Sequence, residues 1–434
     1  MAALTKKHKR TIEFALKHFF SLRALSAPKS TEDLKVPNWL SRQLMLPDGR
    51  VLPITEEGLR HLRTIVSEVS DANVFNGLAG YSDVDGACRN IFAEALSLGR
   101  YPDGADELLD LIRTRLGSEM TTRVFAVLIS GIEFVGIDAL ELGTMRLVLA
   151  SKSHLDAANV KYDPAFLAKA IGSTKANFWL MGSARGTQGV AEARFRGQAS
   201  LVAGMLAISA ASMHENGATG FRIGAVMSPV QARGKAIWLS WIAPNRNLTI
   251  HIGGDGLQNF KINAALAEQF KDSGVFANAF ALFQKEHKSP LEEAIVNAVY
   301  WYSDAHREAE PVMKLVKYWS CVESFFSSGK EKVTQSVSAG LATVLVFGGF
   351  EFLPRSAYIE TKKRITKLYG LRSKALHRAN YRHVSSEDAS RLSQWVAWML
   401  INMVQFAGSG YTNLGQVTKN SERLDALVTG RKTT

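Results

Sequence analysis

One feature restricts the fold of this chain more than any other: helix signals follow one another almost without a break from Ser289 onward. The stretch Ser289-Pro290-Leu291-Glu292 combines a capping serine, a proline at the first helical position and a glutamate that completes a capping box. Beyond it, apolar residues recur at helical spacing over residues 290–308, 311–326, 332–347, 357–377 and 386–406. We therefore predict an all-α domain over residues 289–408, followed by a polar C-terminal tail over residues 409–434.

The chain before Ser289 mixes two kinds of pattern. Residues 1–120 read mainly as helices, with a start at Thr55-Glu56-Glu57 and further helices over 83–98 and 106–116. Strand-forming residues punctuated by glycine follow over 122–135 and 144–150, and again over 178–181, 221–227, 235–242 and 247–252. Residues 261–286 return to a helical pattern. The predicted class is an α+β N-terminal region, divided into residues 1–120 and 121–288, ahead of the helical domain.

The balance of charge indicates a polyanionic partner. With 52 basic and 40 acidic residues the formal charge is +12, and neutralising phosphates with such an excess releases counterions. Between residues 355 and 391 there are ten basic and three acidic side chains, so ten minus three gives +7 in one short stretch. A solvated helical face is the simpler explanation of such a run, and an RNA-binding face is the functional one.

Several classes are disfavoured by what the sequence lacks. No apolar run reaches the roughly 18 residues of a membrane-spanning helix. The basic start of the chain is interrupted by Glu13, Lys17 and His18, which favours an amphipathic helix of the first domain over a targeting segment. Cys88 and Cys321 form no zinc-type cluster with histidine. We expect a cytoplasmic protein with neither a membrane segment, a metal nor a cofactor.

A glycine-rich stretch offers a weaker suggestion. The strand pattern at 178–181 is followed by Gly182, Gly186 and Gly189 and then by a helix over 190–213, an order that can cradle a phosphate. The stretch lacks the Lys-Ser/Thr ending of a nucleotide P-loop and the spacing of a dinucleotide fingerprint, so an ordinary turn is the better interpretation. A nucleotide signal bound there remains the alternative.

The helical segment 357–377 carries the strongest chemical suggestion. Arg372 can hold a phosphate bidentately, and His377 can move a proton to or from a ribose hydroxyl, so together they could cleave a phosphodiester without a metal. Residues five apart on a regular helix are separated by about 140° around its axis. The pairing therefore needs a helix that ends or distorts near His377, or an arginine that reaches round. Alternatively, both residues simply complement the dipole of a last helical turn.

The residues of this region resemble those of the HEPN superfamily, and within it the Apea-like domains of bacterial defence proteins. The resemblance covers roughly residues 289–406 and rests on three stretches: Ala298-Val299-Tyr300-Trp301-Tyr302, residues 318–326 (YWSCVESFF), and residues 367–377 (KLYGLRSKALH), which meets the family's Arg-x4-6-His spacing. It implies an up-and-down helical bundle that forms a homodimer and acts as a metal-independent endoribonuclease, leaving a 2′,3′-cyclic phosphate and a 5′-hydroxyl.

The resemblance also implies roles for individual residues. Arg372 would bind or polarise the scissile phosphate, and His377 would transfer a proton or orient the phosphate. Ser373 occupies the polar position that often follows the arginine. Glu323 matches a supporting acidic position, with a glutamate at the edge of a core helix as the alternative. Arg378 departs from the small residue that many relatives carry after the histidine. The expected RNA contacts are Lys367, Lys374, Arg378 and Arg382.

Two functions follow as expectations. The first is RNA cleavage in anti-phage defence, as in abortive infection, or in a toxin-like role, with a phage-derived or nucleotide trigger acting on the N-terminal region. The second is a non-catalytic HEPN module that binds RNA or a protein partner through the basic face.

Overall fold

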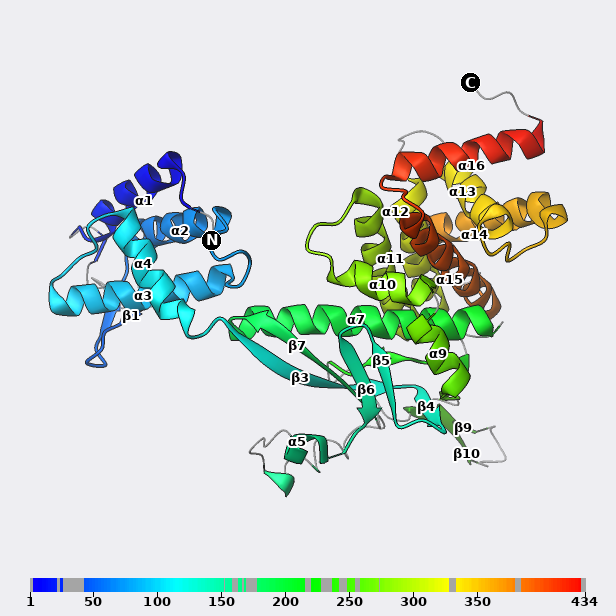
Figure 1. Cartoon of the computed structure of the whole chain (residues 1–434), viewed down its shortest axis with the longest axis horizontal. Coiled ribbons are helices and arrows are strands. Elements are labelled where there is room, and N and C mark those ends of the chain that lie inside the picture. The colour runs from blue at the N-terminus through cyan, green and yellow to red at the C-terminus, as the bar shows by residue number, and fades with distance from the viewer. Residues whose placement is uncertain are drawn as a thin grey trace. The chain divides into compact units, whose positions relative to one another are not determined.

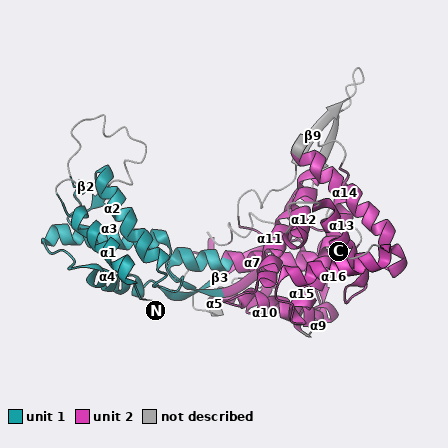
Figure 2. Cartoon of the chain, turned by 90° about the horizontal axis from the view of Figure 1, so that it is seen from above, with its two compact units in different colours: residues 1–125, 183–195 teal, residues 126–182, 196–434 magenta. Residues whose placement is uncertain are grey.

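The computed structural model describes residues 3–21, 24–25, 43–151, 153–157, 163–165, 168, 178–214, 220–227, 236–241, 248–253, 258–272, 274–327, 333–378 and 384–430. The chain forms two compact units, coloured separately in Figure 2. Unit 1 contains residues 1–125 and 183–195, and unit 2 contains residues 126–182 and 196–434. The boundary expected at residue 120 lies close to the end of the first segment of unit 1. The α+β region after it and the helical C-terminal region belong to one unit.

Unit 1 is built mainly from helices that bury one apolar face each. Thr55 caps α2 by accepting a hydrogen bond from the Gly58 amide, as the Thr-Glu-Glu signal predicted. Ile12, Phe19, Leu62 and Phe92 are fully buried in its core. The elements are α1 (Lys6–Phe19), the antiparallel pair β1 (Gln43–Met45) and β2 (Val51–Pro53), α2 (Glu56–Asp71), α3 (Tyr81–Leu98) and α4 (Ala105–Gly117).

The main sheet has five strands in the order β5-β6-β7-β3-β8. Its strands are β3 (Thr121–Ser130), β5 (Ala139–Leu142), β6 (Met145–Leu149), β7 (Phe178–Gly186) and β8 (Gly224–Ala225). β6 pairs antiparallel with both β5 and β7, and Leu147 lies opposite Leu180 in the buried centre of the sheet. β8 is shorter than the strand predicted over 221–227, since only Gly224 and Ala225 pair with β3.

Two smaller sheets accompany the main one. β9 (Ala236–Trp241) and β10 (Leu248–Gly253) form an antiparallel pair, as the strand patterns there predicted. β4 (Ile132–Val135) pairs in parallel with β11 (Phe260–Asn263). The helix predicted over 261–286 therefore begins later and is divided into α9 (Ala264–Asp272) and α10 (Gly274–Gln284). Phe260 and Ile262 are buried while Lys261 and Asn263 are exposed, which is the period of two that a strand requires.

The glycine-rich stretch forms no open loop, which corrects one expectation. β7 extends through Gly182 to Gly186, and α7 (Gln188–Met213) begins two residues later. Thr187 fills the junction, where its amide donates to the Leu78 carbonyl over 2.8 Å and its hydroxyl donates to the Asp83 carboxylate over 2.7 Å. These protein groups occupy the amide and the hydroxyl of the buried Thr187.

The C-terminal region is helical (Figure 1). Its helix bounds match the predicted ones closely. Buried aromatic side chains line the contacts of α12 with its neighbours, among them Tyr302, Tyr318, Trp319 and Phe325. The helices are α11 (Pro290–Arg307), α12 (Pro311–Phe326), α13 (Val333–Phe347), α14 (Tyr358–Arg378) and α15 (Ser386–Gly408). The capping box predicted at Ser289 is present, and a second one lies at Ser385.

The segment expected to be a polar tail forms a further helix, α16 (Leu414–Thr429). Asn413 and Gln416 make a capping box at its start, and Val417, Ser421 and Asp425 are buried along one face. α16 packs on α13 and also contacts α12. The expectation failed because two of the three buried residues, Ser421 and Asp425, are polar, and a search for apolar periodicity does not detect such a face.

Within unit 2, α7 and α11 approach each other closely at Gly204. A Cβ atom at this glycine would lie 2.8 Å from Val299 Cγ1 and 3.0 Å from the Val299 carbonyl oxygen. In Figure 1 the strands lie on one side of this part of α7, and helices α10 and α11 lie on the other. Across the described ranges, no helix has the length and apolar character needed to cross a bilayer.

Candidate active site

Arg372 and Glu323, both singled out in the sequence, lie against each other where α14 packs on α12. Arg372 Nη2 donates to Glu323 Oε2 over 2.9 Å, although the residues are 49 positions apart. Both side chains are about one-fifth exposed, at 20% and 18%. This ion pair is neither in bulk water nor in the dry core, and in such surroundings charge interactions are stronger than at an open surface.

Tyr369 completes a three-residue cluster. Its hydroxyl donates to Glu323 Oε1 over 2.8 Å, while Arg372 Cζ lies 5.6 Å from the centre of its ring. The ring also meets Trp319 edge to face, with 5.0 Å between ring centres. Each oxygen of the Glu323 carboxylate thus has its own donor, one from the tyrosine and one from the arginine.

The pKa of the Tyr369 hydroxyl determines whether this residue acts as a hydrogen-bond donor or as a base. Burial raises the pKa of its hydroxyl to about 12, and the hydrogen bond to Glu323 and the charge of Glu323 act in the same direction. Tyr369 is therefore neutral at physiological pH and serves as a hydrogen-bond donor rather than as a base. The sequence reasoning missed this residue, although its position three before Arg372 places it on the same helical face.

The guanidinium of Arg372 keeps unused capacity. Its Nε atom is buried and has no hydrogen-bond partner within the described part of the chain. Glu323 engages Nη2, and a guanidinium offers five N–H donors in a planar fork that suits the oxygens of a phosphate. The structure therefore holds the arginine in place through Glu323 and Tyr369 without saturating it.

The other predicted site residues lie along α14 or beyond it. Ser373 is half-buried next to Arg372, and Lys367 and Lys374 are exposed. His377 and Arg378 form the end of α14, but their side chains are outside the description, and Arg382 lies outside the described residues altogether. α14 spans Tyr358–Arg378, so its last residue directly follows His377. The Cα atoms of Arg372 and His377 are then about 140° apart around the axis.

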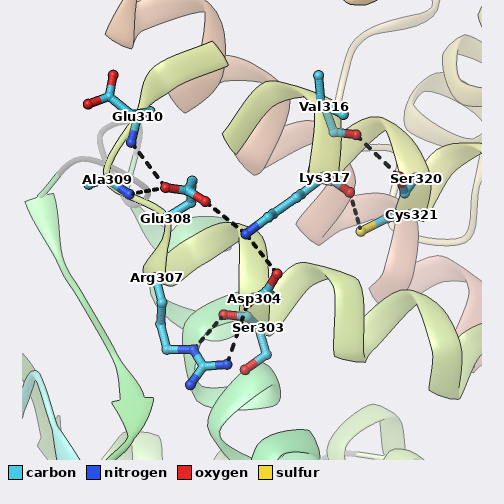
Figure 3. Close-up of polar contacts among 10 residues, drawn as sticks. All are labelled: Ser303, Asp304, Arg307, Glu308, Ala309, Glu310, Val316, Lys317, Ser320 and Cys321. Atoms are coloured by element: carbon cyan, nitrogen blue, oxygen red, sulfur yellow. Dashed lines mark hydrogen bonds and ion pairs between the residues drawn. The ribbon is translucent and has the colours of Figure 1, made fainter. Parts of the chain in front are cut away.

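A second charged cluster joins α11 to α12 and is structural (Figure 3). Lys317 Nζ lies 2.8 Å from Asp304 Oδ2 and 2.8 Å from Glu308 Oε2. Burial alone would lower the pKa of Lys317, but the hydrogen bonds to the two carboxylates raise it. Arg307 Nε donates to the Ser303 carbonyl on the same helix. These contacts fix the turn between the two helices. The ammonium group of Lys317 is ion-paired with carboxylates of the protein itself.

His306 is a buried histidine of unit 2 and a poor candidate for proton transfer. It is fully buried, and neither ring nitrogen has a hydrogen-bond partner among the described residues. Burial lowers its pKa to about 3, and the positive charges of Lys314, Arg222 and Arg307 add to the effect. The ring therefore stays neutral at physiological pH, and its enclosure denies it access to a substrate.

Metal and thiol chemistry find no support in the described residues. No group of three or more histidine, cysteine, aspartate or glutamate side chains is placed there to hold a metal ion. Cys88 and Cys321 are both free and buried, and burial raises the pKa of each thiol. A protonated, enclosed thiol is a poor nucleophile, so neither cysteine competes with the Arg372 cluster as a reactive site.

Comparisons with protein-family models, with curated proteins and with solved structures gave no significant match for this chain.

Proposed function

We propose that the helical C-terminal region is a HEPN-type endoribonuclease that cleaves RNA without a metal ion. The observation that carries the proposal is the cluster of Arg372, Glu323 and Tyr369, which holds a partly unsaturated guanidinium in a half-buried setting. The family resemblance of residues 367–377 supplies the reaction class. The proposed setting is anti-phage defence or a toxin-like activity, by analogy with proteins of this layout.

The proposed reaction is an internal transesterification. The ribose 2′-oxygen attacks phosphorus as its proton passes to a base, and the bond to the 5′-oxygen breaks as that oxygen receives a proton. The products are a 2′,3′-cyclic phosphate and a 5′-hydroxyl. Arg372 stabilises the charge that develops on the phosphate oxygens, and His377 carries out proton transfer.

The active unit is proposed to be a homodimer. Positions 372 and 377 lie about 140° apart around the axis of a regular helix, and a second copy of α14 offers a way to bring an arginine and a histidine together. Two copies of α14 related by a two-fold axis would place Arg372 of one chain opposite the partner's His377. Each dimer would then contain two composite sites.

Cleavage of labelled single-stranded RNA in EDTA tests the activity. We expect cyclic-phosphate products from the wild type and a loss of about 100-fold or more for Arg372→Ala and His377→Ala, because acid–base and electrostatic catalysis each contribute at least that much. Arg423→Ala is the control, since Arg423 is an exposed arginine on α16 and donates a hydrogen bond to Asn420 on the same helix. Wild-type protein that leaves total RNA intact would contradict the proposal.

Mixing the two inactive variants tests the composite site separately. Random exchange of subunits puts half of the dimers into the mixed form, and each of these retains one intact site of two, so about a quarter of wild-type activity should return. A site contained within one chain would give no recovery. This outcome would reject the shared site while leaving the ribonuclease activity in place.

The exposed basic face of α14 favours a second candidate, a non-catalytic HEPN module that binds RNA. Lys363, Arg364, Lys367 and Lys374 are all exposed on this helix. Such binding would weaken with salt, and Lys367→Glu with Lys374→Glu would reduce the slope of log Kd against log salt. Binding by the wild type and by Arg372→Ala without cleavage by either would favour this function.

A further inference from the structure

A cavity of about 840 Å³ opens in unit 2, far in sequence from the Arg372 cluster. It is bordered by the end of α7, the segment before β8, the strands β4 and β11, and the first turns of α9, which packs on β11. This volume falls within the roughly 300–1,000 Å³ that small-molecule sites occupy. All of its lining residues belong to one compact unit, so the cavity is a property of that unit alone.

Aromatic side chains form one wall of the cavity. Phe221 and Phe260 are buried beneath it, with 5.7 Å between their ring centres. His214, at the end of α7, lies 5.0 Å from Phe221 and 6.2 Å from Phe260 and is itself exposed. Three rings in mutual contact, with the outer one accessible, present a surface on which a flat heterocycle stacks.

Amide side chains provide the polar part of the lining. Gln258, Asn259 and Gln269 are exposed at the cavity, while Asn263 Oδ1 accepts a hydrogen bond from the Leu266 amide over 3.0 Å. An amide offers a donor and an acceptor side by side, which is the pattern that pairs with the N6 and N7 atoms of adenine. The amide side chains can therefore hydrogen-bond to the edge of a base while the aromatic wall stacks on its face.

The charged residues of the lining argue against a highly charged ligand. Glu133 of β4 and Lys261 of β11 are partners in the parallel register, and both line the cavity. The negative charge of Glu133 and the positive charge of Lys261 cancel, so the lining lacks the net positive charge that a triphosphate would require. A carboxylate can instead accept hydrogen bonds from ribose hydroxyls, and a single lysine suits at most one phosphate.

We propose that this cavity binds an adenine nucleoside or mononucleotide, with the base stacked on His214 and read by the amide side chains. The site is separate from the glycine-rich stretch at residues 182–189, which contributes no residue to its lining. It does not rest on the ribonuclease proposal, since neither Arg372 nor its partners take part.

Calorimetric titration of the full chain with adenosine, AMP, uridine and ribose 5-phosphate, without RNA, tests this site. We expect saturable binding of adenosine and AMP in preference to uridine, with no binding of the base-free sugar phosphate. His214→Ala should weaken adenosine binding about 5- to 150-fold, as expected for loss of a stacking contact. Because His214 is exposed, this change should leave folding intact.

A blocking variant sharpens the test. Ala265 is an exposed residue in the first turn of α9 that lines the cavity, so Ala265→Trp should fill it and abolish binding. Glu268→Trp places the same side chain at an exposed position of α9 outside the lining and should bind adenosine as the wild type does. Absence of adenosine binding at millimolar concentration, equal binding of ribose 5-phosphate, or undiminished binding by Ala265→Trp would each overturn the proposal.

Discussion

Tyr369 controls the orientation of a carboxylate that in turn holds Arg372. A carboxylate can rotate, and a donor on each oxygen restricts it to one setting. The ring of Tyr369 is fixed by Trp319, whose position is set by the buried core of α12. The placement of the guanidinium therefore depends on a short chain of contacts that leads from the core to the partly exposed site.

Replacing Tyr369 with phenylalanine removes the hydroxyl and leaves the ring in place. We expect the free energy of unfolding to fall by about 1.5–3 kcal/mol, the usual range for a hydrogen bond to a charged group. Urea denaturation measures the change. Tyr411→Phe is the control, because Tyr411 contacts Phe406 through its ring and should change stability by less than about 0.5 kcal/mol. Equal stability of both variants would show that the Tyr369 hydroxyl is not held by Glu323.

His306 predicts a dependence of stability on pH. Its folded-state pKa of about 3 lies below the ordinary 6.5, so the unfolded chain binds a proton between these values and the folded chain does not. Stability should therefore fall by about 1.4 kcal/mol for each pH unit below 6.5 through this residue. His306→Leu should remove that slope between pH 6.5 and 5. Exposed His287→Leu should retain it, and an unchanged slope in His306→Leu would contradict the assignment.

At the scale of elements, α16 attaches to α14 and α13 through a buried polar network. The Tyr358 hydroxyl donates to Asp425 over 2.7 Å, and Lys362 forms an ion pair with the same carboxylate. Thr343 Oγ1 lies 3.3 Å from the Tyr358 hydroxyl, with either oxygen able to donate. The burial of Tyr358 and its contact with Asp425 raise the pKa of its hydroxyl, so it remains a donor. The start of the helix that carries Arg372 is therefore anchored by a segment near the end of the chain.

Asp425→Ala should loosen this attachment. It removes the carboxylate and leaves Lys362 and Tyr358 without their buried partner, which should cost about 3 kcal/mol of stability. Thermal and urea unfolding measure the loss. Glu422→Ala, an exposed change on the same helix, should remain within about 0.5 kcal/mol of the wild type. Similar behaviour of both variants would mean that α16 contributes little to the helical domain.

At the scale of the whole molecule, the sequence predicts local structure well and long-range pairing poorly. Capping boxes and apolar spacing place α11 and α15 to within a few residues, because their causes are local. The pairing of β4 with β11 joins segments more than a hundred residues apart, and no local pattern specifies it. Arg372 is predicted from its own chemistry and Glu323 from a family resemblance, whereas their hydrogen bond depends on how α12 packs against α14.

The division into two units makes a prediction about fragments. Unit 1 includes residues 183–195, from which Thr187 bonds to Leu78 and Asp83, and Arg194 bonds to Gly77. A fragment of residues 1–125 lacks these contacts and should melt at a lower temperature than the same fragment with a peptide of residues 183–195. Circular dichroism melting measures the difference. A scrambled peptide is the control, and equal melting with either peptide would show that the segment adds nothing to unit 1.

The path of the chain has a consequence for how such a protein can evolve. The polypeptide passes between the units three times, after residues 125, 182 and 195. A single crossover between two genes would therefore build at least one unit from segments of both parents, so that side chains from different proteins would have to pack in one core. Exchange of unit 1 between relatives needs two inserted pieces at once. The two units are consequently expected to be inherited as one block.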